Sequence, residues 1–151
     1  MNEVALANVD LLVGALSNLG CSRFYLGDYE TALPHLSQAI ELSKTMTKKN
    51  NILLASVLKK SAWIHFRLRN YELSLKEYQQ AMDLEHKPGD NTIADFATFH
   101  NIALVHCKMH NFLQAIKILN QVRDHSIATW GAYHPSVAKV HIDLGEFSYL
   151  H

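Results

Sequence analysis

The feature that most constrains this chain is a pattern of small and large residues that recurs about every 42 positions. One column of the pattern holds small residues at steps of 42, 41 and 42: Gly20, Ala62, Ala103 and Gly145. Four further columns align without gaps in the first three copies: Tyr29, Tyr71 and Phe112; Ala32, Ser74 and Ala115; Leu36, Tyr78 and Leu119; Ala39, Ala81 and Val122. Repetition at a fixed period indicates a fold built from stacked copies of one unit.

The spacing inside each copy predicts a helical hairpin. The small, large and small columns lie at i, i+4 and i+7, which places them on one face of a helix. A small residue lets a neighbouring helix approach, and the large residue fills the space beside it. The two helical segments are joined by the short hinges GD, RN and HN, which follow Leu26, Leu68 and Met109. So short a connection predicts an antiparallel pair.

The segments between the copies predict where helices begin. They are polar or rich in glycine and proline: TMTKKNN, HKPGDNT and TWGAYHP. Thr92 and Asp95 have the spacing of a capping box, and Pro135 suits the first turn of a helix. Helix starts are expected near 51, 92 and 135, and no segment alternates like a strand. We therefore predict one all-α domain over 1–151, an α-solenoid of seven helices, with repeats at 3–47, 51–86 and 92–129 and a single helix at 135–151.

Composition argues against several classes of protein. With 48% hydrophobic and 19% charged residues, the 151-residue chain has the balance of a folded domain. Fourteen basic residues offset fourteen acidic ones, so no broad positive field favours nucleic acid. The amino terminus has no basic leader and no long apolar run, so neither a signal peptide nor a membrane span is expected. The only cysteines, Cys21 and Cys107, have no paired spacing, which favours a reduced, cytoplasmic protein.

No pattern of residues predicts an enzyme. His106 and His110 are spaced i, i+4 as in some metal sites, but the glutamate of the zinc-protease motif is absent and both fall at structural positions of the repeat. Neither cysteine lies in a recognised catalytic phrase, and no phosphate-binding loop occurs. We expect no catalytic residues, no bound metal and no cofactor.

At the aligned columns the chain resembles the tetratricopeptide repeat family. The match runs from residue 13 to 151 and follows the order large, large, small, aromatic, then aromatic, small, large, small after the hinge. The long period and the phrase TWGAYHPSVAKVHIDLG are similar to repeats of kinesin light chains and nephrocystin-like proteins. The resemblance implies about three repeats plus a single helix, and a concave groove, lined by the first helix of each repeat, that binds a segment of another protein.

Helical projection divides each first helix into a packing side and an outward side. In the first repeat, Leu16, Leu19, Gly20 and Arg23 fall on the packing side. The outward sides hold Gly14, Ser17, Asn18, Cys21, Phe24 and Tyr25; Ser56, Lys59, Lys60, Trp63, Phe66 and Arg67; Ala97, His100, Asn101, Leu104, Cys107 and Lys108. The predicted groove residues are Asn18, Phe24, Tyr25, Lys59, Lys60, Trp63, Phe66, Arg67, Asn101 and Lys108. Aromatic residues beside cations are typical of binding hot spots and favour a peptide or helix with apolar side chains and acidic neighbours.

Two alternatives concern this groove. Large aromatic residues at helical spacing also fill cores, so burial of Trp63 and Phe66 stays open. Another branch of the family binds chaperone tails through a carboxylate clamp, and the matching positions here are Ser17, Cys21, Lys60, Ala97 and Asn101. Four of these five are the wrong residue type, and Lys60 stands where the clamp has asparagine. A heat-shock co-chaperone role is therefore not expected.

The last predicted helix has an apolar and a polar face. The apolar face holds Val137, Val140, Leu144, Phe147 and Leu150, and the polar face holds Lys139, Asp143 and Glu146. Such a helix suits a solvating cap of the solenoid, or an interface between copies through 135–151. The leading hypothesis is a protein-interaction module. A self-assembling structural unit and the regulatory domain of a larger protein remain as alternatives.

Overall fold

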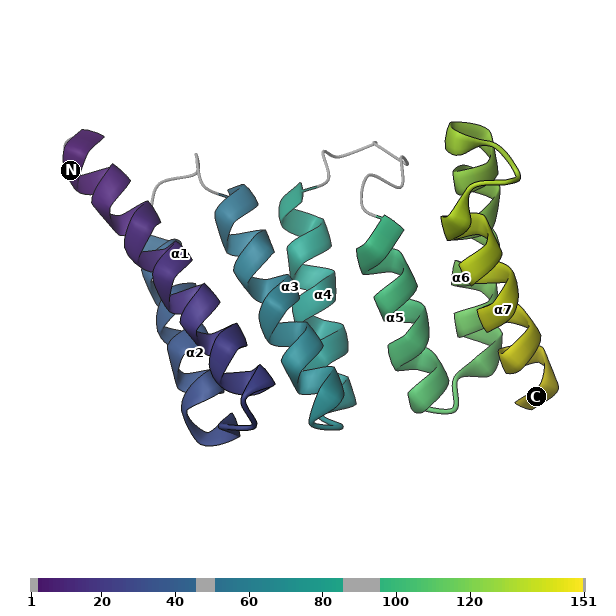
Figure 1. Ribbon diagram of the computed structural model, residues 1–151, viewed down its shortest axis with the longest axis horizontal. Coiled ribbons are helices and arrows are strands. Elements are labelled where there is room, and N and C mark those ends of the chain that lie inside the picture. The colour runs from purple at the N-terminus through teal and green to yellow at the C-terminus, as the bar shows by residue number, and fades with distance from the viewer. Residues whose placement is uncertain (1–2, 46–50, 86–95, 151) are drawn as a thin grey trace. The chain divides into compact units, whose positions relative to one another are not determined.

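The computed structural model describes residues 3–45, 51–85 and 96–150, and within these ranges it contains α-helices and no strand (Figure 1). The helices are α1 (Glu3–Tyr25), α2 (Tyr29–Thr45), α3 (Asn51–Arg67), α4 (Tyr71–Glu85), α5 (Phe96–Lys108), α6 (Phe112–Trp130) and α7 (Pro135–Leu150). The all-α prediction is confirmed, and α3 and α7 begin where the sequence predicts. The start expected near 92, with the Thr92–Asp95 capping box, lies outside the described residues.

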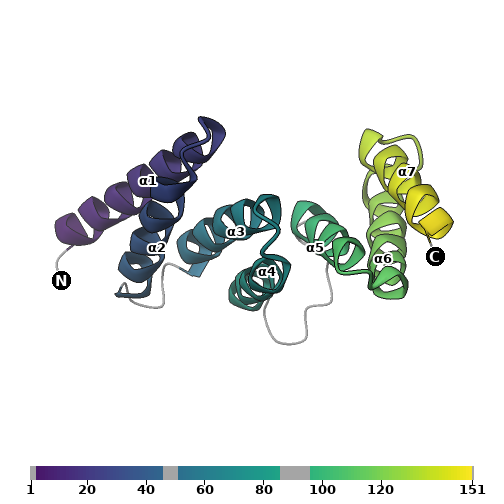
Figure 2. The ribbon, with the colours of Figure 1, turned by 90° about the horizontal axis from the view of Figure 1, so that it is seen from below.

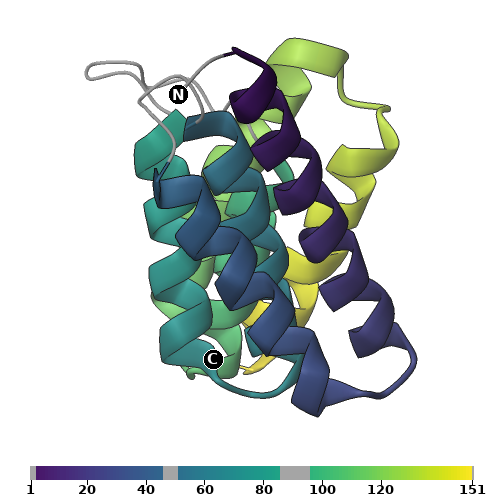
Figure 3. The same ribbon diagram turned by 90° about the vertical axis from the view of Figure 1, so that its left-hand side faces the viewer.

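The chain divides into two compact units, residues 1–87 and 88–151. In the first unit, α1 pairs with α2 and α3 pairs with α4, while α3 also contacts both helices of the first pair. Figure 3 shows α1 and α2 running side by side in opposite directions. In the second unit, α5 pairs with α6, and α7 packs beside α6 (Figure 2). The expectation of one domain over 1–151 stays a prediction.

The three hinges share one backbone geometry. Their middle residues adopt a left-handed conformation, with φ of 83° at Gly27, 64° at Arg69 and 62° at His110. At the first hinge, the Asp28 N–H donates to the Arg23 carbonyl (2.9 Å) and the Gly27 N–H donates to the Phe24 carbonyl (3.0 Å). The same two hydrogen bonds recur at the ends of α3 and α5. This pair of bonds is the Schellman motif, which ends a helix and sets the direction of the next segment.

The repeated columns form the core of each hairpin. The nine residues of the small, large and small columns are all buried: Ala32, Ser74, Ala115, Leu36, Tyr78, Leu119, Ala39, Ala81 and Val122. The two helices of the first hairpin approach closely at Gly20, where an added Cβ would lie 2.9 Å from both the Ala32 carbonyl oxygen and Leu36 Cγ. In the second hairpin, Ser74 Oγ donates to the Ala62 carbonyl (2.8 Å). The predicted packing of small against large residues is confirmed.

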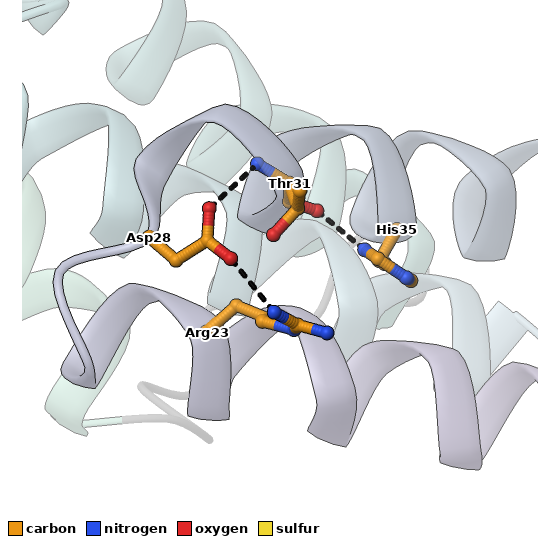
Figure 4. A network of polar contacts seen from close by, with 4 residues as sticks. All are labelled: Arg23, Asp28, Thr31 and His35. Atoms are coloured by element: carbon orange, nitrogen blue, oxygen red, sulfur yellow. Dashed lines mark hydrogen bonds and ion pairs between the residues drawn. The ribbon is translucent and has the colours of Figure 1, made fainter.

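Two residues expected on the packing side of α1 are exposed instead. Leu19 is 41% exposed, and the Arg23 side chain lies in solvent beside the hinge. Because α1 makes its main contacts with α2 and α3, the flank that carries these residues is left uncovered. Arg23 Nη1 lies 2.8 Å from Asp28 Oδ2, and Asp28 Oδ1 accepts from the Thr31 N–H (3.4 Å), which ties the end of α1 to the start of α2 (Figure 4). The hydrogen bonds from Thr31 and Arg23 hold the pKa of Asp28 below its usual value.

Candidate functional site: a cleft between α1 and α3

A cleft of about 410 Å³ lies between α1 and α3, within the first unit. Its lining residues are Cys21, Phe24 and Tyr25 from α1 and Ser56, Lys59, Lys60, Trp63 and Ile64 from α3. These positions meet because both helices are the first helices of their hairpins and α3 packs beside α1. Five predicted groove residues thus line one cleft: Phe24, Tyr25, Lys59, Lys60 and Trp63.

Aromatic side chains form the apolar wall of the cleft. Phe24, expected to face outward, is only 6% exposed and meets Tyr25 edge to face, with ring centroids 5.7 Å apart. Tyr25 is 73% exposed. Trp63 stacks on Phe66 at 5.4 Å, and both are partly exposed, so neither belongs to the fully buried core. The wall therefore offers aromatic surface to a ligand while Phe24 anchors it to the protein.

Arg67 connects the aromatic groups of the two helices. Its Cζ atom lies 5.9 Å from the Phe24 ring centroid and 5.7 Å from the Trp63 ring centroid. Both distances fit cation–π contacts, which orient a guanidinium without neutralising its charge. The exposed Arg67 thus places a positive charge at the end of the aromatic wall.

The two lysines of the cleft have different partners. Lys60 Nζ donates to Ser17 Oγ (2.7 Å) and Asn18 Oδ1 (3.0 Å), two neutral groups of α1. Lys59 Nζ lies 2.8 Å from Glu85 Oε1 at the end of α4, and both side chains are mostly buried. Glu85 therefore offsets much of the charge of Lys59, whereas Lys60 keeps its own. The sequence did not predict this pairing, because Glu85 lies 26 residues away on another helix.

Cys21 lies on the wall beside Lys60 but does not have the character of a nucleophile. Burial raises the pKa of its thiol, and the nearby Lys60 charge offsets only part of that rise. The thiol is therefore neutral at physiological pH, whereas the thiolate is the reactive form. Cys21 thus contributes apolar surface to the cleft.

The predicted groove residues of α5 belong to the second unit. Asn101 is partly buried and Lys108 is exposed, and their part in a shared groove stays a prediction. His100 and Cys107, expected on the same outward side, are buried. His100 Nε2 lies 2.5 Å from Asp143 Oδ2, so this side of α5 contacts α7. Helical projection could not predict that contact, because it depends on how successive helices stack.

Another cleft, of about 530 Å³, lies between α2, α3 and α4. It has no aromatic side chain among its described lining residues, and its Lys44 is paired with Glu41 at 2.6 Å. Its buried acid, Glu77, has a pKa raised to about 7, chiefly by loss of hydration. The α1–α3 cleft, in contrast, has aromatic side chains and two cations, Lys60 and Arg67, whose contacts are with neutral groups. These features favour it as the candidate binding site.

The described residues offer few features for other chemistry. They contain no cluster of three or more His, Cys, Asp and Glu side chains placed to hold a metal ion. His106 and His110 do share a shallow pocket at the hinge after α5, and burial lowers the pKa of His106. Among the helices as described, none is long and apolar enough to cross a membrane.

Comparison with known proteins indicates the family of this arrangement. The model of the tetratricopeptide repeat family matches residues 11–84. The crystal structure of BtubC (BKLC) from P. vanneervenii superposes with a TM-score of 0.79 over 95% of this chain, at 20% identity. A putative kinesin light chain of Podospora anserina, with nearly identical TPR-like repeats, gives 0.75 over 91% at 16% identity. The first TPR domain of Spaghetti (RPAP3), bound to the HSP90 peptide SRMEEVD, gives 0.68 over 93% at 12% identity.

The chain is shorter than some of these proteins. It spans 57% of BtubC and 65% of the Podospora structure, but 96% of the Spaghetti domain. No curated protein matches it in sequence. At these identities the superpositions establish the shared helical-repeat fold, and the ligands of the similar proteins remain their own.

Proposed function

Since the chain belongs to the tetratricopeptide repeat family, we propose that it is a protein-interaction module that binds a segment of another protein in the α1–α3 cleft. The Spaghetti domain, solved with an acidic peptide, supports peptide binding by this fold. Cys21 and Cys107 are free thiols, which supports a reducing compartment, and we place the protein in the cytoplasm. We assign it no catalytic role and no nucleic-acid or membrane partner.

The observation that carries this proposal is the pairing of aromatic surface with cations held by neutral groups. Trp63 and Tyr25 offer partly exposed rings, while Lys60 contacts Ser17 and Asn18 and Arg67 contacts only rings in the interactions described above. A ligand carboxylate would therefore meet positive charge without displacing an acidic residue of the protein. The ligand that fits this chemistry is a peptide with an aromatic or large apolar residue next to Asp or Glu.

The test measures binding of a fluorescein-labelled peptide that carries one tryptophan flanked by aspartate and glutamate. The double variant Lys60→Glu, Arg67→Glu should weaken binding at least about tenfold, because two attractive charges become repulsive. The matched control, Lys76→Glu with Lys117→Glu, makes the same charge change outside the cleft and should retain affinity. Equal binding by the cleft variant and the control would refute the proposal, provided circular dichroism shows both to be folded.

An intrinsic reporter gives an independent measurement of the same contact. The described ranges include both tryptophans of the chain, Trp63 in the cleft and Trp130 at the end of α6. In the Trp130→Phe variant, an unlabelled peptide without tryptophan but with phenylalanine should shift the Trp63 emission on binding. In the Trp63→Phe variant, the emission of Trp130 should not change. A change confined to Trp130 would place the peptide elsewhere.

A further inference from the structure

Helix α7 exposes an apolar stripe along the side opposite its buried valines. Ala138, Ile142, Gly145 and Tyr149 are all exposed, with 63% of Ile142 and 91% of Tyr149 accessible. Their separations of four, three and four residues match the seam of a two-stranded coiled coil. Val137 and Val140, in contrast, are buried within the unit. The described part of α7 therefore has two packing faces, of which one is covered.

The residues of α1 in the same repeat columns show how such a helix face packs when a neighbouring helix covers it. Its residues are Val13, Ser17, Gly20 and Phe24, which fall in the same repeat columns, and each is buried. At Gly20 the backbone of α2 is so close that a Cβ would clash, whereas a Cβ at Gly145 would meet nothing within 4 Å. Gly20 and Gly145 share a repeat column, but only Gly20 is in contact with a neighbouring helix.

We propose that the α7 stripe pairs with the α7 stripe of a second copy of this chain, in antiparallel orientation. A two-fold axis between Asp143 and Leu144 places Ile142 opposite the partner's Gly145, and Ala138 opposite the partner's Tyr149. Each large side chain then faces a small one, which is the packing that the repeat uses within its own hairpins. The stripe is thus complementary to its own copy in this orientation.

Charge favours the same register. Lys139 and Glu146 are exposed and lie seven residues apart on one flank of the stripe. In the antiparallel pair, Lys139 of one chain lies nearest Glu146 of the other, and the symmetry repeats this ion pair. A parallel two-fold pair would instead place the flanks that carry Lys139 and Glu146 on opposite sides of the seam, so that this ion pair could not form. The charges therefore select the antiparallel arrangement.

The size of the stripe predicts a weak dimer. Four residues spanning eleven positions extend over roughly 16 Å of helix, which is well short of a standard interface that buries about 1,600 Å² in total. The expected state is thus a monomer–dimer equilibrium at micromolar concentrations. The inference does not depend on the α1–α3 cleft, and either proposal stands if the other fails.

Sedimentation equilibrium of the 151-residue chain from about 1 µM to 1 mM tests the pairing. The wild-type mass should rise toward that of a dimer. Lys139→Glu and Glu146→Lys should each weaken the homodimer by about three- to tenfold, because two exposed ion pairs become like-charge contacts. An equimolar mixture of these two variants should associate about as well as wild type, because every cross-chain contact in the heterodimer joins opposite charges.

Two further results would contradict the proposal directly. The first is a constant monomer mass up to 1 mM, which would leave the stripe to a helix of another protein. The second is a dimer that persists unchanged in Ile142→Glu, which would locate the interface on another surface. Ile142 is exposed, so its substitution should leave the helical circular dichroism of the monomer unchanged. The control Lys117→Glu, on α6, should dimerise like wild type.

Discussion

His100 of α5 and Asp143 of α7 are joined in the same register as Ser17 of α1 and Lys60 of α3. In the first pair Nε2 lies 2.5 Å from Oδ2, and in the second Nζ lies 2.7 Å from Oγ. Each pair links residues that are 43 positions apart. Ser17 and His100 occupy the same position of their repeats, and Lys60 and Asp143 occupy another shared position in the following repeats. The residue types differ while the geometry recurs. The stacking of first helices therefore includes a polar contact whose chemistry can change from repeat to repeat.

Removing the acid of the His100–Asp143 pair should weaken the attachment of α7. Asp143→Ala would leave the buried His100 without this partner, and we expect the free energy of unfolding to fall by about 2 kcal/mol. The exposed neighbour Glu146→Ala should change it by less than about 0.5 kcal/mol. Urea denaturation at low micromolar protein, followed by circular dichroism, measures both. Equal effects of the two variants would show that the His100–Asp143 contact contributes nothing specific.

Two glycines of α1 should respond to alanine in opposite ways. Gly20→Ala places a Cβ against the backbone of α2 and should destabilise the chain by roughly 1–3 kcal/mol, because a packed interface must separate. A Cβ added at Gly14 would meet no atom within 4 Å, so Gly14→Ala should stabilise the helix by about 0.5–1 kcal/mol. Thermal unfolding of both variants makes the comparison. A stabilising Gly20→Ala would mean that α1 and α2 are less tightly packed.

The hinge residues provide a test of backbone conformation. Arg69 adopts φ of 64°, a region that costs a side chain about 1–2 kcal/mol and costs glycine little. Arg69→Gly should therefore stabilise the second hairpin by about 0.5–1 kcal/mol, less any side-chain contact that is lost. Gly27→Ala, at the matching position of the first hinge, should have the opposite sign. Guanidinium denaturation of the two variants checks the predicted opposition.

Glu77 should make stability depend on pH. Burial raises its pKa from the usual 4.5 to about 7, so the folded state favours the neutral acid. The unfolded chain releases this proton at lower pH, and the contribution of Glu77 to stability is therefore complete below about pH 4.5 and lost as the pH rises through about 7. Glu77→Gln should remove this loss. The measurement is urea unfolding of both proteins from pH 5 to pH 8.

His65 contributes in the opposite direction. Its Nε2 atom lies 3.9 Å from Glu77 Oε1, and burial lowers its pKa below the usual 6.5. Its contribution is complete above pH 6.5 and is lost as the pH falls below that value. In Glu77→Gln the stability should therefore rise with pH across the acidic range. A variant that still loses stability between pH 5 and pH 7 would show that Glu77 is not the group responsible.

Much of the fold could be predicted from the sequence, because the contacts within a hairpin are local and periodic. The columns of Ala32, Leu36 and Ala39 predicted the α1–α2 interface, and the hinge phrase at Leu26 predicted its turn. Leu19 and Arg23 were placed on the wrong side, because an angular projection assigns a face to a helix without showing how far the neighbouring helix covers it.

The residues that line the candidate cleft could largely be predicted from the sequence, but the partners of its two lysines could not. The aromatic residues and lysines of α1 and α3 meet because repeat columns align across neighbouring helices, and a projection captures that alignment. The pairing of Lys59 with Glu85 depends on where α4 ends relative to α3. Likewise, the contact of Lys60 with Ser17 and Asn18 requires the stacking of two hairpins. Such contacts depend on where one helix ends relative to another and on how the hairpins stack. The projection of a single helix carries no information about either.

The shared geometry of the three hinges also limits how such a chain tolerates changes of length. If the hinge kept the hydrogen bonds that fix the start of α2 relative to the end of α1, one residue inserted after them would rotate every following position of α2 by about 100° around its axis. Ala32 and Leu36 would then turn away from Gly20, and bulkier neighbours would replace them. A substitution at a hinge changes the local backbone conformation, but an insertion or deletion changes which residues of the whole following helix face the core. Genetic variants that change hinge length should therefore be far more damaging than those that change hinge sequence.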